Sequence, residues 1–196
     1  MGDEGLITAD RIILAASELF QENGFHPVSM KNIAVRANVS EMTVFRHFTS
    51  KKQVLEAVIK KMSYIPPLKE VFDDRICWDL ETDLLLISET YQKIMMCNQS
   101  AFLISLREEK TIPEISEFIR QGPPQFKSFL KNYFLTMQEK KKIEKNDIES
   151  LTLTFMAINF GYFFFKVCGR EMEMVGVSDK QYLETAIHLF ARGIKP

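Results

Sequence analysis

The chain of 196 residues contains only three cysteines, and no two of them lie at a metal-binding spacing. Because Cys77, Cys97 and Cys168 are scattered and odd in number, we expect reduced, mostly packed thiols rather than a disulfide framework. The sequence therefore predicts no metal site, and we expect no cofactor.

Catalytic motifs are missing as well. The three histidines are dispersed along the chain, no serine or cysteine occurs in a nucleophile motif, and no glycine-rich phosphate loop is present. We therefore expect no catalytic residue and no enzyme. A helical enzyme without a recognisable motif is the competing hypothesis at this point.

Neither sign of charge dominates, and no long apolar run is uninterrupted. The formal net charge is −1, so total charge neither favours nor excludes nucleic acid. The most apolar window, residues 151–168, is interrupted by Asn159, Gly161 and Lys166, which is typical of a buried helix rather than a membrane span. The first ten residues, MGDEGLITAD, are polar and acidic, unlike a signal peptide. We expect a cytoplasmic protein with no membrane partner.

Helical periodicity is present in almost every segment, and no convincing period of two appears. Hydrophobic residues make up 46% of the chain, enough to bury a core. Pro66-Pro67 is predicted to end the fourth helix, and Gly122-Pro123-Pro124 to break a later helical region. We expect an all-α protein with two domains, residues 1–65 and 66–196.

Two short helices close to the N-terminus form a helix-turn-helix pattern. Ser29 and Ser40 stand where helix N-caps are expected, and Asn38 stands in the turn between them, where a left-handed residue is required. Val39 and Val44 supply the apolar contacts that hold the second helix against the first. The second helix is then short and mostly exposed, and a third serine, Ser50, caps the next helix.

The exposed side of this second helix carries groups suited to gripping or reading a partner rather than to packing. These residues are Glu41, Met42, Thr43, Arg46 and His47. The surrounding segment, residues 31–61, contains seven basic and two acidic residues, a net charge of +5 in a chain that is −1 overall. Neutralising DNA phosphates requires such a local basic patch. Solvated helix faces are the alternative, which we favour for Lys60 and Lys61.

Residues 8–62 resemble the DNA-binding domain of the tetracycline-repressor (TetR) family. The resemblance rests on Ile12, Ala15, Phe20, Gly24-Phe25, Ser29 to Ala34, Ala37 to Ser40, Thr43 to Phe45, His47-Phe48 and Ser50-Lys51. The rest of the chain is similar to the family only in its expected all-helical architecture. The resemblance implies a homodimeric transcriptional regulator, most often a repressor, that binds operator DNA and leaves it when a small ligand enters the second domain.

The resemblance also implies roles for single residues. Thr43 matches a position that touches bases or backbone, whereas Ser29, His47 and Lys51 match phosphate-contacting positions. We expect the DNA-binding residues to be Ser29, Lys31, Ser40, Glu41, Met42, Thr43, Phe45, Arg46, His47 and Lys51. The chain departs from the family pattern at Glu41, Met42 and Phe45, where Lys, Gly or Ala, and Tyr are common. These departures bear on the operator sequence rather than on DNA binding itself.

A helix expected over residues 148–167 is apolar nearly all round and must be covered on two sides. The family implies that a partner subunit is one cover; the alternative is the core of a single monomer. The predicted dimer interface comprises Ala157, Phe160, Gly161, Phe164, Tyr182, Ala186 and Phe190.

Phenylalanines and methionines are dense in the second domain and suit an adaptable apolar cavity, although each one alone is more often a core residue. The predicted ligand-binding residues are Met95, Phe102, Phe126, Phe129, Phe155 and Asn159. For Asn159 a structural hydrogen bond ranks before a ligand contact. No acidic pair stands out, which favours a small apolar ligand of neutral or acyl type. A DNA-binding adaptor without a ligand remains the alternative function.

Overall fold

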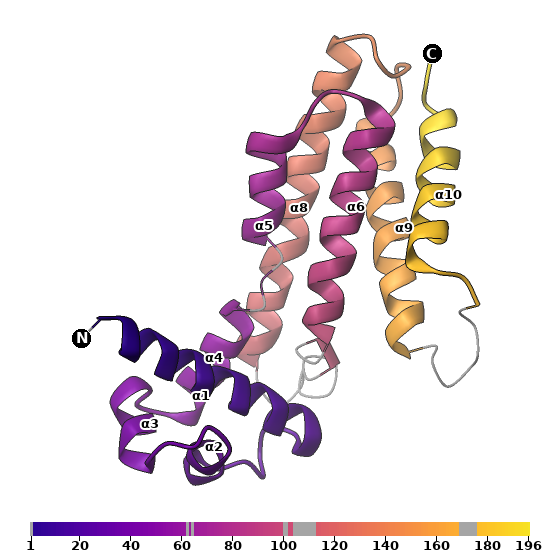
Figure 1. Ribbon diagram of the computed structural model, residues 1–196. Helices are drawn as coiled ribbons and strands as arrows, with labels where there is room; N and C mark the ends of the chain where they lie inside the picture. Colours follow the sequence, from indigo (N-terminus) through magenta and orange to yellow (C-terminus); the bar gives the residue numbers. More distant parts are fainter. Residues whose placement is uncertain (1, 62, 64, 100–101, 104–112, 169–175) are drawn as a thin grey trace. The chain divides into compact units, whose positions relative to one another are not determined.

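In the computed structural model the chain is helical throughout its described part, which comprises residues 2–61, 63, 65–99, 102–103, 113–168 and 176–196 (Figure 1). The first helices are α1 (Gly2–Asn23), α2 (Met30–Arg36), α3 (Glu41–His47) and α4 (Lys51–Lys61). They are followed by α5 (Ile65–Glu70), the π-helical turn η1 (Val71–Arg75), α6 (Leu80–Cys97), α8 (Pro113–Glu139), α9 (Ile148–Cys168) and α10 (Asp179–Arg192). No strand occurs within these ranges, so the all-α prediction is confirmed.

The chain forms two compact units. The first comprises residues 1–63 and 97–120, and the second comprises residues 64–96 and 121–196. The first of these breaks, after Ser63, lies close to the predicted boundary, whereas residues 97–120 group with the N-terminal helices. The division into residues 1–65 and 66–196 stays a prediction for the functional domains.

Local sequence signals set the ends of the first helices. Ser29 Oγ accepts a hydrogen bond from Asn32 N at 3.1 Å, and Ser29 N donates to Asn32 Oδ1 at 2.8 Å, which is a reciprocal cap for α2. Ser40 Oγ likewise accepts from Thr43 N at 3.0 Å. Gly24 ends α1 with a φ of 78°, a left-handed conformation that costs glycine little. The predicted caps are confirmed.

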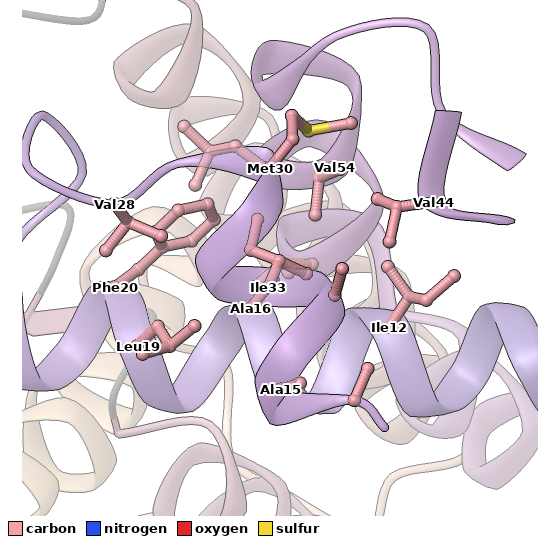
Figure 2. Packing of buried hydrophobic residues seen from close by; sticks show 14 of the residues in the cluster. Ile12, Ala15, Ala16, Leu19, Phe20, Val28, Met30, Ile33, Val44 and Val54 are labelled. Carbon is pink, nitrogen blue, oxygen red and sulfur yellow. The ribbon is translucent and has the colours of Figure 1, made fainter. Parts of the chain in front are cut away.

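The core of the first unit is a cluster of buried side chains from α1, α2, α3 and α4 (Figure 2). Ile12, Phe20 and Ile33 are fully buried in it. Val44 is also fully buried and attaches α3 to this core. Burying a side chain of this size stabilises a fold by about 1.5–3 kcal/mol. The short helix α3 is therefore held in place by the buried Val44, and its other side chains are exposed or half-buried.

One of the two predicted proline effects is observed. The fourth helix, α4, ends at Lys61, before Pro66-Pro67, as predicted. The two prolines lie in the first turn of α5, where a missing N–H leaves no helical bond unmade. Pro123 and Pro124 lie inside α8, which continues through them to Glu139. The φ angle of proline is close to the helical value, and both rings are exposed, so they stay out of the packed core. The predicted break at 122–124 is wrong.

Aromatic contacts tie the helices of the second unit into a bundle. Tyr91 of α6 stacks on Phe126 of α8 with ring centroids 5.4 Å apart. Phe155 of α9 meets Phe134 of α8 at 6.2 Å and Phe190 of α10 at 5.5 Å. Each ring is shared between neighbouring helices, so the core depends on all of them.

A polar cluster lies between α8 and the N-terminal part of α6. The fully buried carboxylate of Asp83 accepts hydrogen bonds from Cys77 N at 2.9 Å, Cys77 Sγ at 3.2 Å and Tyr133 OH at 3.0 Å. Burial, followed by the negative charge of Asp83, raises the pKa of Tyr133 and keeps its hydroxyl protonated as a donor. Trp78 stacks on Tyr133 at 5.9 Å, and the ammonium group of Lys140 lies 4.9 Å from the Trp78 ring centroid.

Candidate nucleic-acid interface

The turn between α2 and α3 is fixed by backbone hydrogen bonds and by a side chain from α1. Val39 N donates to Ala34 O at 3.0 Å, and Asn38 adopts a φ of 53°, as the sequence predicts. The guanidinium Nη2 of Arg11 donates to Ala37 O at 2.6 Å and to Asn38 O at 3.1 Å. Arg11 was not expected to matter, because nothing in its local sequence points to a contact 26 residues away.

Beyond its anchor Val44, α3 presents a mixed polar and apolar surface. Met42 is 82% exposed and Phe45 is 47% exposed, unusual values for large apolar side chains. Glu41 and Arg46 are exposed beside them, and Arg46 makes no ion pair or hydrogen bond with the described residues. Thr43 is half-buried, and its Oγ1 shares a 2.8 Å hydrogen bond with Ser40 Oγ. Four of the predicted residues of α3 therefore share one exposed face, Glu41, Met42, Phe45 and Arg46, whereas Thr43 and His47 are half-buried.

Two of the three predicted phosphate contacts, Lys51 and Ser29, are engaged within the chain, and the third, His47, is half-buried. The Lys51 ammonium donates to Phe25 O at 2.9 Å and His26 O at 3.0 Å and lies 4.3 Å from the Phe25 ring centroid. Ser29 caps α2 as described above. His47 is half-buried, with its Nε2 enclosed and without a hydrogen-bond partner among the described residues. A phosphate bond from His47 therefore requires Nδ1 or a rotation of the ring.

The net positive charge of this region is lower in the folded chain than a count over residues 31–61 indicates, because acidic residues of α1 pair with some of its bases. Arg36 pairs with Glu22 at 2.8 Å and with Glu18 at 3.2 Å, and Lys61 pairs with Asp10 at 2.7 Å. The hydrogen bond from Arg36 lowers the pKa of Glu22, which keeps that partner charged. Acids of α1 thus neutralise two of the seven bases, whereas Lys31 and Arg46 remain exposed near the helix-turn-helix.

Residues 12–58 match the model of the family described as "Bacterial regulatory proteins, tetR family". The match covers every buried residue of the α1 to α4 cluster except Ile59. The N-terminal part of this chain is therefore similar to the DNA-binding domain of that family. Proteins of that family are helix-turn-helix transcriptional regulators, and the capped helices α2 and α3 with the turn between them have the geometry of that motif.

Similar proteins extend the likeness over the whole length. The chain is 29% identical to the uncharacterised HTH-type transcriptional regulator YvkB of Bacillus subtilis, covering 95% of this chain and 97% of that protein. A presumed transcriptional regulator from Saccharomonospora viridis, solved in complex with choline, has a TM-score of 0.75 at 20% identity, covering 96% and 97%. NalD of Pseudomonas aeruginosa, the secondary repressor of a multidrug efflux pump, has a TM-score of 0.71 at 18% identity and covers 98% of both chains. At these identities the solved structures indicate a shared fold.

The predicted ligand residues of this chain lie mainly in its second unit. Phe126, Phe155 and Asn159 are buried to 1% exposure or less, and Met95 to 9%. Phe129 is half-buried and packs against Phe72 of η1 with ring centroids 5.5 Å apart. The half-buried Phe102 groups with the first unit. The structure thus brings together a smaller set than the sequence suggested.

The predicted dimer residues fall into two groups. On α9, Phe160 is 44% and Phe164 is 40% exposed, and Ala157 is exposed beside them. On α10, Tyr182, Ala186 and Phe190 are half-buried. Tyr182 stacks on Tyr162 of α9 at 3.7 Å.

Two further side chains were missed by sequence reasoning. Leu153 is 53% exposed and Leu189 is 65% exposed, and they extend the apolar surface of α9 and α10. By length and composition alone α9 could cross a membrane, but its other side packs into the bundle through Phe155 and Phe163, both fully buried. A helix buried on one side and apolar on the other requires a second cover.

Proposed function

We propose that this chain is a homodimeric transcriptional regulator that binds operator DNA through α3 and releases it when a small molecule binds in the second unit. The observation that carries the proposal is the capped, core-anchored α3, which leaves Glu41, Met42 and Arg46 exposed in the position where the TetR family reads DNA. The exposed apolar surface of α9 and α10 supports a dimer, because a second subunit would cover it. A dimer would also provide two α3 helices, one for each half-site of an operator.

Met42 and Phe45 suggest how the operator is read. Apolar side chains distinguish bases by contact with the thymine methyl group in the major groove, whereas hydrogen-bonding side chains read donors and acceptors. With Met42 82% and Phe45 47% exposed, the chain offers more apolar than polar readout on α3. We expect thymine at one or more positions of each half-site, and phosphate contacts from Arg46, Lys31 and Lys51.

Selection of bound sequences from a random DNA pool, followed by footprinting, tests the proposal. The expected result is a palindromic site whose two halves are related by about 10 base pairs or a multiple of that spacing. Arg46→Met should raise the protein concentration needed for protection, whereas Lys93→Met, an exposed change on α6, should leave it unchanged. Binding without any sequence preference would instead favour a structural or adaptor role on DNA.

Release by a ligand requires a coupling free energy between the two units. A tenfold loss of operator affinity needs about 1.4 kcal/mol of differential ligand binding. Reciprocity requires operator DNA to weaken ligand binding by the same factor, so the test measures both affinities. A compound that binds the second unit without changing operator affinity is no effector.

A further inference from the structure

Four buried polar atoms of the second unit have no hydrogen-bond partner among the residues that the structure describes. They are Ser88 Oγ and Gln92 Oε1 on α6, and Thr152 Oγ1 and Asn159 Oδ1 on α9. Ser88 and Thr152 are 0% exposed, Gln92 is 3% exposed and Asn159 is 1% exposed. Buried polar atoms are normally paired, so four such atoms on two helices of one bundle require an explanation.

The four atoms belong to two helix faces that meet. Ser88 and Gln92 are four residues apart on α6, and Thr152 and Asn159 are seven apart on α9, so each pair shares one face of its helix. The Gln92 side chain joins the two faces, because its Nε2 donates to the backbone oxygen of Asn159 at 2.7 Å. In Figure 1 both helices run in the same direction within the bundle. The unpaired atoms therefore lie along one seam.

Hydrogen bonds to the amide nitrogens fix what the unpaired oxygens can do. Asn159 Nδ2 donates to Phe155 O at 3.0 Å, and Gln92 Nε2 donates to Asn159 O. Flipping either amide would place its oxygen against a carbonyl oxygen, so the assignment follows from the contacts. Gln92 Oε1 and Asn159 Oδ1 are therefore acceptors that await a donor, and the hydroxyl groups of Ser88 and Thr152 can act in either sense.

The rest of this core does satisfy its polar groups. Asp83, also fully buried, receives three donors from Cys77 and Tyr133. The unpaired seam is thus not a sign of loose packing throughout the second unit. Other core residues of the second unit are apolar: Tyr91 of α6 stacks on Phe126 of α8, and Ile87 of α6 is fully buried.

We propose that the effector of this chain is a largely apolar molecule with at least one N–H or O–H group, which donates to Gln92 Oε1 and Asn159 Oδ1. The inference rests on the proposed ligand-responsive function and names the chemical class of the ligand. A carboxylate, an ether or a plain hydrocarbon leaves both oxygens unpaired, and a site with buried acceptors discriminates strongly against such analogues. The acyl-type ligand favoured by the sequence alone does not match these two acceptors.

Matched probes test the requirement for a donor. Indole and indene are nearly the same size and differ in one N–H group; 1-naphthol differs from naphthalene by a hydroxyl, and from 1-methoxynaphthalene by the donor hydrogen. Dissociation constants for the full chain are measured by calorimetry or ligand-observed NMR. We expect indole and 1-naphthol to bind at least about tenfold tighter than their donor-free partners. Equal affinities within each set, or no binding by any probe at millimolar concentration, would overturn the inference.

Variants locate the donor site. Gln92→Met and Asn159→Leu remove the acceptors, and the preference for donors should fall to within about twofold in both. Gln125→Met, the same kind of change at an exposed position of α8, is the control and should keep the full preference. A preference that persists in Gln92→Met and Asn159→Leu would place the donor contact elsewhere and would overturn the assignment.

Thermal unfolding without ligand shows whether the buried oxygens of the seam lack hydrogen-bond partners or are hydrogen-bonded to buried water. Ser88→Ala and Thr152→Val remove the hydroxyl groups with little change of shape. If these oxygens lack partners, the melting temperature stays the same or rises. A fall of several degrees in both variants would show a structural network bridged by water and would overturn the proposal.

Operator binding distinguishes this inference from the proposed function. If donor probes bind selectively but operator affinity does not change, the donor site stands and release by ligand is wrong. If indene and naphthalene weaken operator binding as strongly as indole and 1-naphthol, release by ligand stands and the donor requirement is wrong.

Discussion

The two units of this chain use many of their polar side chains differently. In the first unit the polar side chains around the turn are used internally: Ser29 and Ser40 cap helices, and Arg11 and Lys51 donate to backbone carbonyl oxygens. In the second unit Gln92 and Asn159 keep buried acceptors unpaired. Both units expose apolar side chains: α3 exposes Met42 and Phe45, and α9 exposes Leu153 and Phe160. The polar side chains of the first unit stabilise its own fold, whereas the unpaired acceptors of the second unit fit the binding of a ligand that donates hydrogen bonds.

The largest expected effect comes from disrupting the proposed dimer contact on the apolar surface of the second unit. Adding a side chain at Gly161 meets no atom within 4 Å in a single chain, so Gly161→Leu should fold. In a dimer packed through Ala157 and Gly161 the added Leu overpacks the contact and should dissociate it, since overpacking costs about 1–3 kcal/mol at each of two symmetric positions. Analytical ultracentrifugation measures the change.

Leu135→Gln, a change to an exposed apolar residue of α8, is the matched control and should stay dimeric. If Gly161→Leu remains dimeric at low micromolar concentration, the interface lies on another surface.

A second comparison separates two arginines of the first unit. Arg11→Met removes the hydrogen bonds to Ala37 O and Asn38 O and should lower stability by about 1–2 kcal/mol, together with operator affinity. Arg46→Met should weaken operator binding without lowering the melting temperature, because Arg46 has no described partner in the free chain. Unfolding curves and DNA titrations on both variants check the contrast, which fails if the two variants lose stability equally.

Lys51 should combine both behaviours. Lys51→Ala is expected to reduce the dependence of operator affinity on salt by about 0.9 in the logarithmic slope, and to weaken all DNA sequences alike. It should also destabilise the first unit slightly, because the ammonium group no longer holds Phe25 O and His26 O. An unchanged salt slope with a lower melting temperature would assign Lys51 a structural role only.

The smallest expected effect concerns single methyl groups of the operator. Replacing a contacted thymine by deoxyuridine removes only the methyl group and should cost less than about 1 kcal/mol. The loss should vanish in Met42→Ala or in Phe45→Ala, according to which side chain makes the contact. Losses that persist in both variants would show that the α3 apolar residues do not read that position.

Sequence reasoning succeeded where the signal was local. The caps at Ser29 and Ser40, the left-handed Asn38 and the buried Val44 each follow from preferences within a few residues. It failed at Pro123, where the helix tolerates a residue that usually ends one.

Contacts between distant segments were the other limit. Arg11 binds a turn 26 residues away, and the seam between Gln92 and Asn159 joins residues 67 apart. Asn159 attracted notice as the lone amide in an apolar run, but Ser88 and Thr152 look like ordinary polar positions. Only the packed helices reveal that these hydroxyl groups are buried.

The stacked Trp78 allows the unfolding of the second unit to be followed separately by fluorescence. Trp78 is the single tryptophan of the chain, and its ring lies against Tyr133 and near the Lys140 ammonium group. Its fluorescence therefore reports the unfolding of the second unit, whereas far-ultraviolet circular dichroism sums the helices of both. If the two signals change at different denaturant concentrations, the units unfold as separate cooperative blocks, and an effector should shift only the fluorescence transition.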